Sequence, residues 1–339
     1  MRPAAAPPVP GSASPAEHVP VLLQEVLDLL PVSPGGRVLD LTLGLGGHAE
    51  AILARAGADV RYLGVDRDPR ARERARARLG SDARITIMAG TYEDVWEDPG
   101  FQAWMHLQAP QGPDAVLMDL GVSSLQLKDP ERGFSFQAEG PLDMRMDPGT
   151  GPTALEWLDQ QTEATLADTL YQFGEERASR PIARAILRSR DAGGLRTTLD
   201  LAAAVYTVLS REAARRKHQI DPATRTFQAV RIAVNGELAR LARTLETAAL
   251  SLKPGGRLGV ISFHSLEDRI VKQTLRRLAG VYDGPGRTAP EPLPRRIRLV
   301  HPGGIKPGEA ETAANPPSRS ARLRVGERIQ DDPTARTQP

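Results

Sequence analysis

Residues 37–48 read RVLDLTLGLGGH, a mostly apolar run followed by a turn that contains three glycines. The run predicts a β-strand over Arg37–Leu43, and the residues after the turn predict a helix over Gly47–Ala56. Glycines at the carboxyl end of a parallel strand let the backbone approach a ligand closely. A glycine-rich turn is common, so this stretch indicates a ligand-binding loop only in combination with the rest of the chain.

Four further apolar runs extend the pattern. They predict strands over Arg61–Val65, Arg84–Met88, Ala115–Leu120 and Arg257–Phe263, with an arginine-rich helix over Pro69–Leu79. Strands that alternate with helix-length segments indicate βαβ units. We therefore expect an α/β fold with a Rossmann-like, mostly parallel sheet.

The long segment between Gly121 and Arg257 is far longer than one βαβ crossover requires. Residues 153–216 carry apolar residues at helical spacing with no strand pattern, so we predict an all-helical subdomain inserted into the sheet domain. The expected organisation is a disordered tail over 1–16, a Rossmann-like domain over 17–135 and 221–329, an inserted helical domain over 136–220, and a disordered tail over 330–339.

Composition excludes several classes of protein. The chain of 339 residues has no cysteine, which excludes disulfides and thiolate nucleophiles and suits the cytoplasm. No apolar run is long enough to span a bilayer, so we expect no membrane association. The net charge is only +2, but residues 284–329 hold nine basic residues against four glutamates. This distribution predicts a near-neutral body with a basic extension.

Two cofactor classes compete for the glycine-rich loop. Asp66 follows the second strand, 22 residues after Gly44, where a carboxylate can accept hydrogen bonds from a ribose; alternatively it caps the helix that begins at Pro69. The full dinucleotide fingerprint is absent, because Gly47, His48 and Ala49 follow Gly46. Asp40 would repel a pyrophosphate but suits a sulfonium and an amine, which favours S-adenosylmethionine over NAD.

Longer motifs carry a specific resemblance. The chain resembles the RsmH (formerly MraW) family from about His18 to Arg328 in the segments at residues 119–124 (DLGVSS), 131–136 (ERGFSF), 140–146 (GPLDMRM), 174–177 (GEER), 222–232 (PATRTFQAVRI) and 261–269 (ISFHSLEDR). The resemblance implies a class I S-adenosylmethionine-dependent methyltransferase with an inserted helical domain. Its implied reaction is methylation of the exocyclic N4 of a cytidine in the decoding region of 16S rRNA.

The resemblance also implies a set of cofactor contacts, namely Gly46, Gly47, His48, Asp66, Tyr92, Asp119 and Gln126. Tyr92 stands where phenylalanine is common in the family and keeps a ring for stacking on adenine. Leu41 and Leu125 replace a small residue and a proline, respectively. These departures are small, so we expect the cofactor pocket to be kept.

Two residues are candidates for catalysis. Asp119 closes the fourth predicted strand and could face the methyl donor, the N4 amine, or both. His264 ends the predicted strand at residues 257–263 and could approach the same crevice, although a lone histidine also serves as a structural residue. Ser123 is either a contact to the base or a helix cap. His48 has no second ligand at helical spacing, so no metal is predicted.

The expected partner is the small ribosomal subunit, and a homodimer stays open. Candidate phosphate contacts are Arg215, Arg216, Lys217, Arg225, Arg231, Arg295, Arg296 and Arg298, whereas the arginines of Pro69–Leu79 spread around a helix and indicate a solvated face. Two other functions remain open on the residues alone. One is an NAD-dependent oxidoreductase, and the other is a non-catalytic ribosome-assembly factor that has kept the fold.

Overall fold

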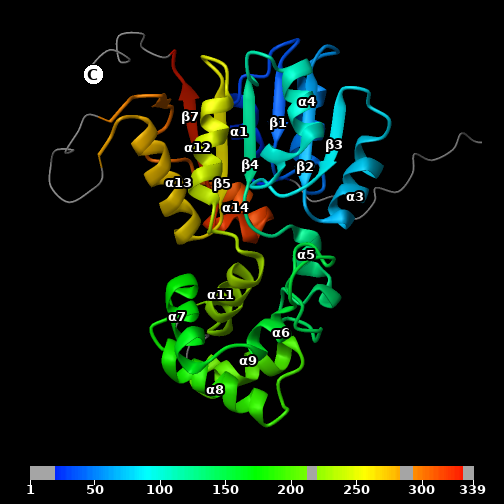
Figure 1. The fold of residues 1–339 in the computed structure, drawn as a ribbon. Coiled ribbons are helices and arrows are strands. Elements are labelled where there is room, and N and C mark those ends of the chain that lie inside the picture. Colours follow the sequence, from blue (N-terminus) through cyan, green and yellow to red (C-terminus); the bar gives the residue numbers. More distant parts are fainter. Residues whose placement is uncertain (1–19, 212–219, 283–292, 331–339) are drawn as a thin grey trace, which may run out of the picture.

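The computed structural model describes residues 20–211, 220–282 and 293–330. In this part of the chain one seven-stranded sheet has the order β3-β2-β1-β4-β5-β7-β6 (Figure 1). The strands are β1 (Arg37–Asp40), β2 (Arg61–Asp66), β3 (Ile85–Ala89), β4 (Ala115–Asp119), β5 (Arg257–Ser262), β6 (Ile297–Leu299) and β7 (Arg322–Arg328). The first five pair in parallel, as predicted, and β7 runs antiparallel to both β5 and β6.

The five predicted strands are all present, and the main difference lies at the end of β1. The strand was expected to reach Leu43 but stops at Asp40. Leu43 still donates its amide to the carbonyl of Val65, and the chain then turns through Gly44 at φ +54°. The loop therefore begins earlier than the apolar pattern indicated, because Leu41 and Leu43 are buried loop residues and not strand residues.

Helices cover both faces of the sheet. On one face α1 (Leu23–Leu29), α2 (Gly47–Arg55) and α3 (Pro69–Leu79) share a core with Val38, Tyr62 and Leu117. On the other face α4 (Pro99–Gln108), α12 (Leu241–Ser251) and α13 (Ser265–Leu278) share a core with Leu39, Leu63 and Met118. Successive side chains along a strand thus pack against opposite helix layers, as expected for a sheet that is buried on both faces.

The expected basic extension is partly a structural element of the sheet, which corrects the reading of residues 284–329. β7 is buried between β5 and β6, and Arg324 on it is 5% exposed. Its guanidinium donates to both carboxylate oxygens of Asp268, at 2.7 and 3.0 Å. The basic residues counted in 284–329 therefore include an arginine that is buried and paired within the sheet.

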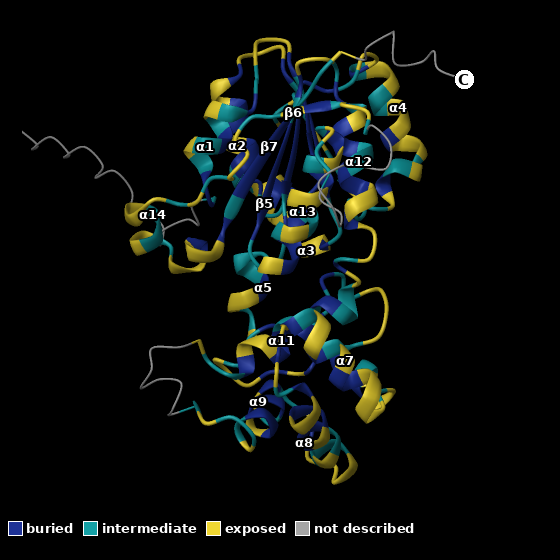
Figure 2. Ribbon diagram, turned by 90° about the vertical axis from the view of Figure 1, so that its left-hand side faces the viewer, coloured by how far each residue is buried: buried dark blue, intermediate teal, exposed yellow. Residues whose placement is uncertain are grey.

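A second, all-helical body lies below the carboxyl ends of the strands (Figures 1 and 2). It follows α5 (Ser124–Lys128) and contains α6 (Ala154–Asp159), α7 (Glu163–Gly174), α8 (Ser179–Asp191), α9 (Thr198–Tyr206) and α11 (Ala223–Asn235). These helices enclose a core of their own, to which Phe134 and Met144 also contribute. Phe227 and Val230 of α11 lie in that core, although residues 221–235 were expected in the Rossmann-like part.

A short helix before β7 connects the C-terminal part of the chain to the N-terminal part. A short helix, α14 (Glu309–Ala314), precedes β7, and its Glu311 accepts a hydrogen bond from the amide of Leu22. No helix among the described residues is both long and apolar enough to cross a membrane. The expected tail over 1–16 and the candidate RNA contacts Arg215, Arg216 and Lys217 lie outside the described residues.

Candidate active site

The glycine-rich loop requires glycine at two positions. Gly46 has φ +77° at the N-cap of α2, and a Cβ added there would lie 3.1 Å from Leu79. A Cβ on Gly47 would come within 2.5 Å of the Pro20 ring. Side chains at these positions would strain the backbone or displace Pro20. Glycine is therefore required at both positions by the protein's own packing, against Leu79 at Gly46 and against Pro20 at Gly47.

Asp66 anchors this loop to the end of β2. Its two carboxylate oxygens accept hydrogen bonds from the amides of Gly44, at 2.7 Å, and Asp68, at 2.8 Å. The cap of α3 is Asp68, which accepts from the amide of Arg70 at 3.0 Å. The alternative in which Asp66 caps this helix is therefore wrong. Burial raises the pKa of the Asp66 carboxyl.

Asp40 does not play the role that favoured S-adenosylmethionine at the sequence level. It is 1% exposed, and its oxygens accept from the Tyr62 hydroxyl at 2.7 Å and from the Thr42 amide at 3.0 Å. Burial raises the pKa of Asp40 to about 6. Because the carboxyl is buried, it holds the start of the loop through Thr42 and acts on a ligand only through its charge.

Asp119 is the carboxylate that the fold leaves available. Its side chain is 27% exposed, and its Oδ2 lies 3.7 Å from Nε2 of His48 at the start of α2. The other oxygen, Oδ1, is buried and has no hydrogen-bond partner among the described residues. Burial, followed by the charges of Asp40 and Glu267, raises the pKa of Asp119 to about 8. An orphaned carboxylate oxygen of this kind indicates a place where a ligand completes the hydrogen bonding.

Tyr92 and Gln126 are held by the protein itself. The Tyr92 hydroxyl donates to the carbonyl of Glu237 at 2.8 Å, which fixes the ring next to the segment between α11 and α12. The amide group of Gln126 is occupied at both ends, accepting from Ser123 N at 2.9 Å and donating to Asp68 Oδ2 at 2.8 Å. Ser123 is the N-cap of α5, which is the structural alternative for that residue.

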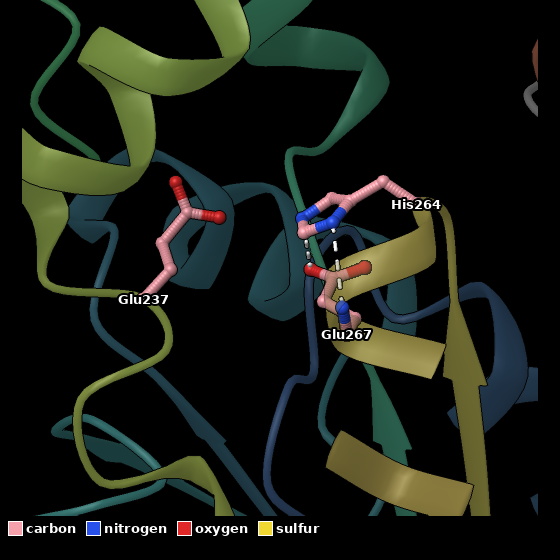
Figure 3. A group of neighbouring side chains, drawn as sticks. All are labelled: Glu237, His264 and Glu267. Carbon is pink, nitrogen blue, oxygen red and sulfur yellow. Dashed lines mark hydrogen bonds and ion pairs between the residues drawn. The ribbon is translucent and has the colours of Figure 1, made fainter. Parts of the chain in front are cut away.

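His264 caps α13 and lies beside two acidic residues (Figure 3). Its Nδ1 accepts from the amide of Glu267 at 3.4 Å, and its Nε2 lies 3.2 Å from Glu267 Oε1. Glu237 faces this pair from the end of the helical body. Glu237 and Glu267 were not predicted from the sequence. For Glu267 a signal existed, because a glutamate three residues after a capping residue is typical of a helix start.

The comparisons with known proteins decide the family. A model described as the MraW methylase family matches residues 15–329. The chain belongs to the MraW methylase family.

Curated relatives agree with this assignment. A protein of Stenotrophomonas maltophilia named "Ribosomal RNA small subunit methyltransferase H" is 45% identical over 331 residues, which cover 96% of this chain and 97% of the relative. A protein of the same name from Xanthomonas axonopodis pv. citri is 47% identical over 320 residues, covering 94% and 89% of the two chains. The resemblance is confirmed, and the oxidoreductase alternative is set aside.

As a member of the MraW methylase family, the protein uses S-adenosylmethionine, and its residues fit that cofactor. The orphaned Asp119 oxygen offers an acceptor. Asp66 holds the loop in shape. Direct cofactor contacts by His48, Asp66, Tyr92 and Gln126 stay predictions.

The candidate RNA-contacting arginines differ in how far they are buried. Arg231 was a candidate RNA contact, but its guanidinium donates to both oxygens of Glu237, each at 2.8 Å, and its side chain is 16% exposed. Arg298 is 58% exposed and pairs with Glu327. Arg225 and Arg295 are exposed as well. Arg231 is therefore corrected to a structural ion pair, whereas the exposed arginines keep their predicted role.

Tyr92 allows a test of the ring separately from its hydroxyl. Tyr92→Ala should weaken the binding of S-adenosylmethionine by about 1–3 kcal/mol, because a base stacked on an aromatic ring gains roughly that much. Tyr92→Phe keeps the ring and loses only the hydrogen bond to the Glu237 carbonyl. The Kd of this variant should stay within about threefold of the wild-type value, because that hydrogen bond does not involve the cofactor and contributes only about 1 kcal/mol. Calorimetric titration checks both; equal affinity in Tyr92→Ala would show that the ring does not contact the adenine.

Cofactor binding should release protons. The pKa of Asp119 is raised to about 8, so this carboxyl is mostly protonated at neutral pH in the free protein. A sulfonium and an ammonium favour the ionised form, so up to about one proton should leave as S-adenosylmethionine binds at pH 7, and affinity should rise with pH until the pH passes about 8.

Titration in two buffers of different ionisation enthalpy measures this release. Asp119→Asn, which cannot ionise, should abolish the proton release.

The free energy of unfolding should also depend on pH through Asp119. The folded state retains a proton that the unfolded state loses above pH 3.8. The contribution of this group to stability is therefore present below pH 3.8 and is lost as the pH rises to about 8.

Proposed function

We propose that this protein transfers a methyl group from S-adenosylmethionine to the exocyclic N4 of a cytidine in the decoding region of 16S rRNA. The single observation that supports it most is Asp119, a partly exposed carboxylate with an orphaned oxygen at the carboxyl end of β4. The names of the relatives, which specify small-subunit ribosomal RNA, support the class of substrate.

Bound S-adenosylmethionine supplies an electrophilic methyl carbon. The N4 lone pair of cytosine is conjugated with the ring, so the amine is a weak nucleophile. A carboxylate of Asp119 would accept a hydrogen bond from N4 and orient its lone pair, and would afterwards take the proton that the methylated amine loses. His264 lies next to Glu267, with Nε2 3.2 Å from Oε1, and acts as a positioning residue that does not touch the amine.

The substrate is proposed to approach between the two bodies. A cytosine inside a helix cannot reach a buried methyl donor, so the base would have to leave its stack. The exposed Arg225 and Arg298 would contact phosphates, and the helical body would recognise the surrounding rRNA. The partner is then the small ribosomal subunit in the cytoplasm, and the assembly into a homodimer stays open.

Labelled S-adenosylmethionine incubated with unmethylated small subunits tests the function. Digestion of the rRNA to nucleosides should release label in N4-methylcytidine. Label in another nucleoside would overturn the substrate assignment. Absence of label with naked rRNA, with assembly intermediates and with mature subunits would instead support the non-catalytic assembly factor.

A further inference from the structure

Glu175 follows the last residue of α7 in a backbone conformation that a glutamate rarely adopts. Its φ is +49°, in the left-handed region where a helix usually ends on glycine. The preceding residue, Gly174, packs against α11, because a Cβ added to it would lie 2.7 Å from the carbonyl oxygen of Arg225. The end of α7 is thus held by the helical body, and the strain of a glutamate there indicates that its side chain has a use.

The Glu175 carboxylate reaches the other body. Its Oε2 accepts from the Ser265 hydroxyl at 2.6 Å, and its Oε1 accepts from the Arg269 guanidinium at 2.7 Å. Both donors belong to the first turns of α13, which begins three residues after the end of β5. In Figure 1, α7 and the lower end of α13 lie on the same side of the molecule. Glu175, Ser265 and Arg269 therefore form a latch between the helical body and the sheet domain.

The latch differs from the other connections between the two bodies. The chain itself passes between them twice, from β4 to α6 and from α11 to α12. The buried pair of Arg132 with Asp68, at 2.8 Å, fixes the first passage, and the Tyr92 hydroxyl, which donates to the Glu237 carbonyl, fixes the second. The neighbours of α7 in the chain, α6 and α8, both belong to the helical body. The latch is therefore a tie that no covalent connection accompanies.

The latch is also exposed. The Glu175 side chain is 43% exposed and the Arg269 side chain 53%. An ion pair of this exposure adds little to the free energy of unfolding. Two hydrogen bonds to the two oxygens of one carboxylate, however, fix both its distance and its direction. The latch is thus suited to set the orientation of the helical body and not to hold the fold together.

We propose that Glu175 is a positioning residue for methyl transfer. Through Ser265 and Arg269 it fixes the orientation of the helical body at the carboxyl end of the sheet, so that rRNA held by that body presents its cytidine at Asp119. The proposal rests on the proposed function for the identity of the substrate. A displacement of about 1 Å in a bound reactant can lower a rate about a hundredfold, so a weak restraint on orientation has a large effect on turnover.

Exchange of the two charges tests the latch. Glu175→Arg and Arg269→Glu each place like charges together, so each should lower kcat on small subunits by about tenfold. The double variant restores an ion pair and should recover kcat to within about threefold of the wild-type value. Two slow single variants without recovery in the double variant would contradict the proposal.

The helical body provides a matched control pair. Glu163 and Arg184 lie 3.4 Å apart, are 51% and 56% exposed, and both belong to that body. Glu163→Arg and Arg184→Glu should leave kcat within about twofold of the wild-type value. Direct binding of a phosphate by Arg269 predicts a different pattern, in which Arg269→Glu raises KM and Glu175→Arg lowers it. That pattern would overturn the proposal.

A further variant protects the test against misfolding. Glu175→Gly suits the left-handed backbone and removes the carboxylate. The urea midpoint of this variant should be no lower than that of the wild type, whereas kcat should fall as in Glu175→Arg. Wild-type kcat in Glu175→Gly would contradict the proposal.

A distance measurement tests the latch without RNA. The chain has no cysteine, so Tyr171→Cys on α7 and Lys272→Cys on α13, both at exposed positions, can carry spin labels. Pulsed electron paramagnetic resonance should give a narrow distance distribution with the latch intact, a broader one with Glu175→Arg, and a narrow one again after charge exchange. An equally narrow distribution with Glu175→Arg would overturn the proposal. A latched protein that methylates no small subunit would contradict the proposed function alone.

Discussion

Asp119→Ala should lower kcat for rRNA methylation by at least about a hundredfold, the usual effect of removing a group that handles a proton in the transition state. The variant loses the only orphaned carboxylate oxygen that the described part of the chain places at the end of β4. Without it, the N4 amine has no acceptor to orient its lone pair or take its proton. Initial rates with labelled S-adenosylmethionine and small subunits measure the effect.

Two further variants serve as controls for Asp119→Ala. Asp119→Asn has nearly the same shape but cannot take a proton, so it should lose nearly as much activity as Asp119→Ala. Asp168→Ala, on the exposed surface of α7, should keep the rate of the wild type. Near wild-type turnover in Asp119→Asn would show that the carboxylate is not the proton acceptor.

Arg132→Met should lower the free energy of unfolding more than any other substitution proposed for this protein. The Arg132 guanidinium is buried, pairs with Asp68 at 2.8 Å, and also donates to the carbonyls of Arg145 and Met146, both at 2.9 Å. Removal leaves a buried carboxylate and two carbonyls without this donor. Breaking a buried ion pair from one side typically costs about 3–5 kcal/mol. The free energy of unfolding from urea titration, followed by circular dichroism, measures the loss.

The chain provides a matched control for that substitution. Arg55 also pairs with an aspartate, Asp28 at 3.0 Å, but both side chains are more than half exposed. Arg55→Met should therefore cost less than about 1 kcal/mol. A loss in Arg132→Met no larger than that in Arg55→Met would contradict the structural role of the buried pair. Arg132→Met should also weaken S-adenosylmethionine binding, because its partner Asp68 accepts a hydrogen bond from Gln126 and caps α3.

The parallel strands could be predicted because their signals are local. Apolar runs that alternate with helix-length segments identified β1 to β5, and the proline in its first turn identified α3, whose predicted bounds Pro69–Leu79 match the structure. The β7 strand was missed because three arginines and a glutamate interrupt its apolar residues. Only the pairing with β5 and β6 shows that Leu323 and Val325 face the core.

The candidate site shows the same division. The positions of Gly46, Gly47, Asp66 and Asp119 followed from the ends of strands, whose order along the chain is enough to place them at one edge of the sheet. The roles of Asp40 and Arg231 did not follow, because Asp40 accepts a hydrogen bond from Tyr62 and Arg231 pairs with Glu237, and spacing alone does not indicate these contacts.

The sequence by itself determined the α/β class, the glycine-rich loop, the helical insertion and, through its long motifs, the family. Each of these depends on residues close together in the chain. Only the tertiary structure decided which acids are shielded and which one is available, since burial and pairing join residues such as Asp68 and Arg132, or Asp40 and Asp119, across the sheet and the loops. Desolvation and neighbouring charge act through space, so the chemistry of the site depends on packing that no local pattern records.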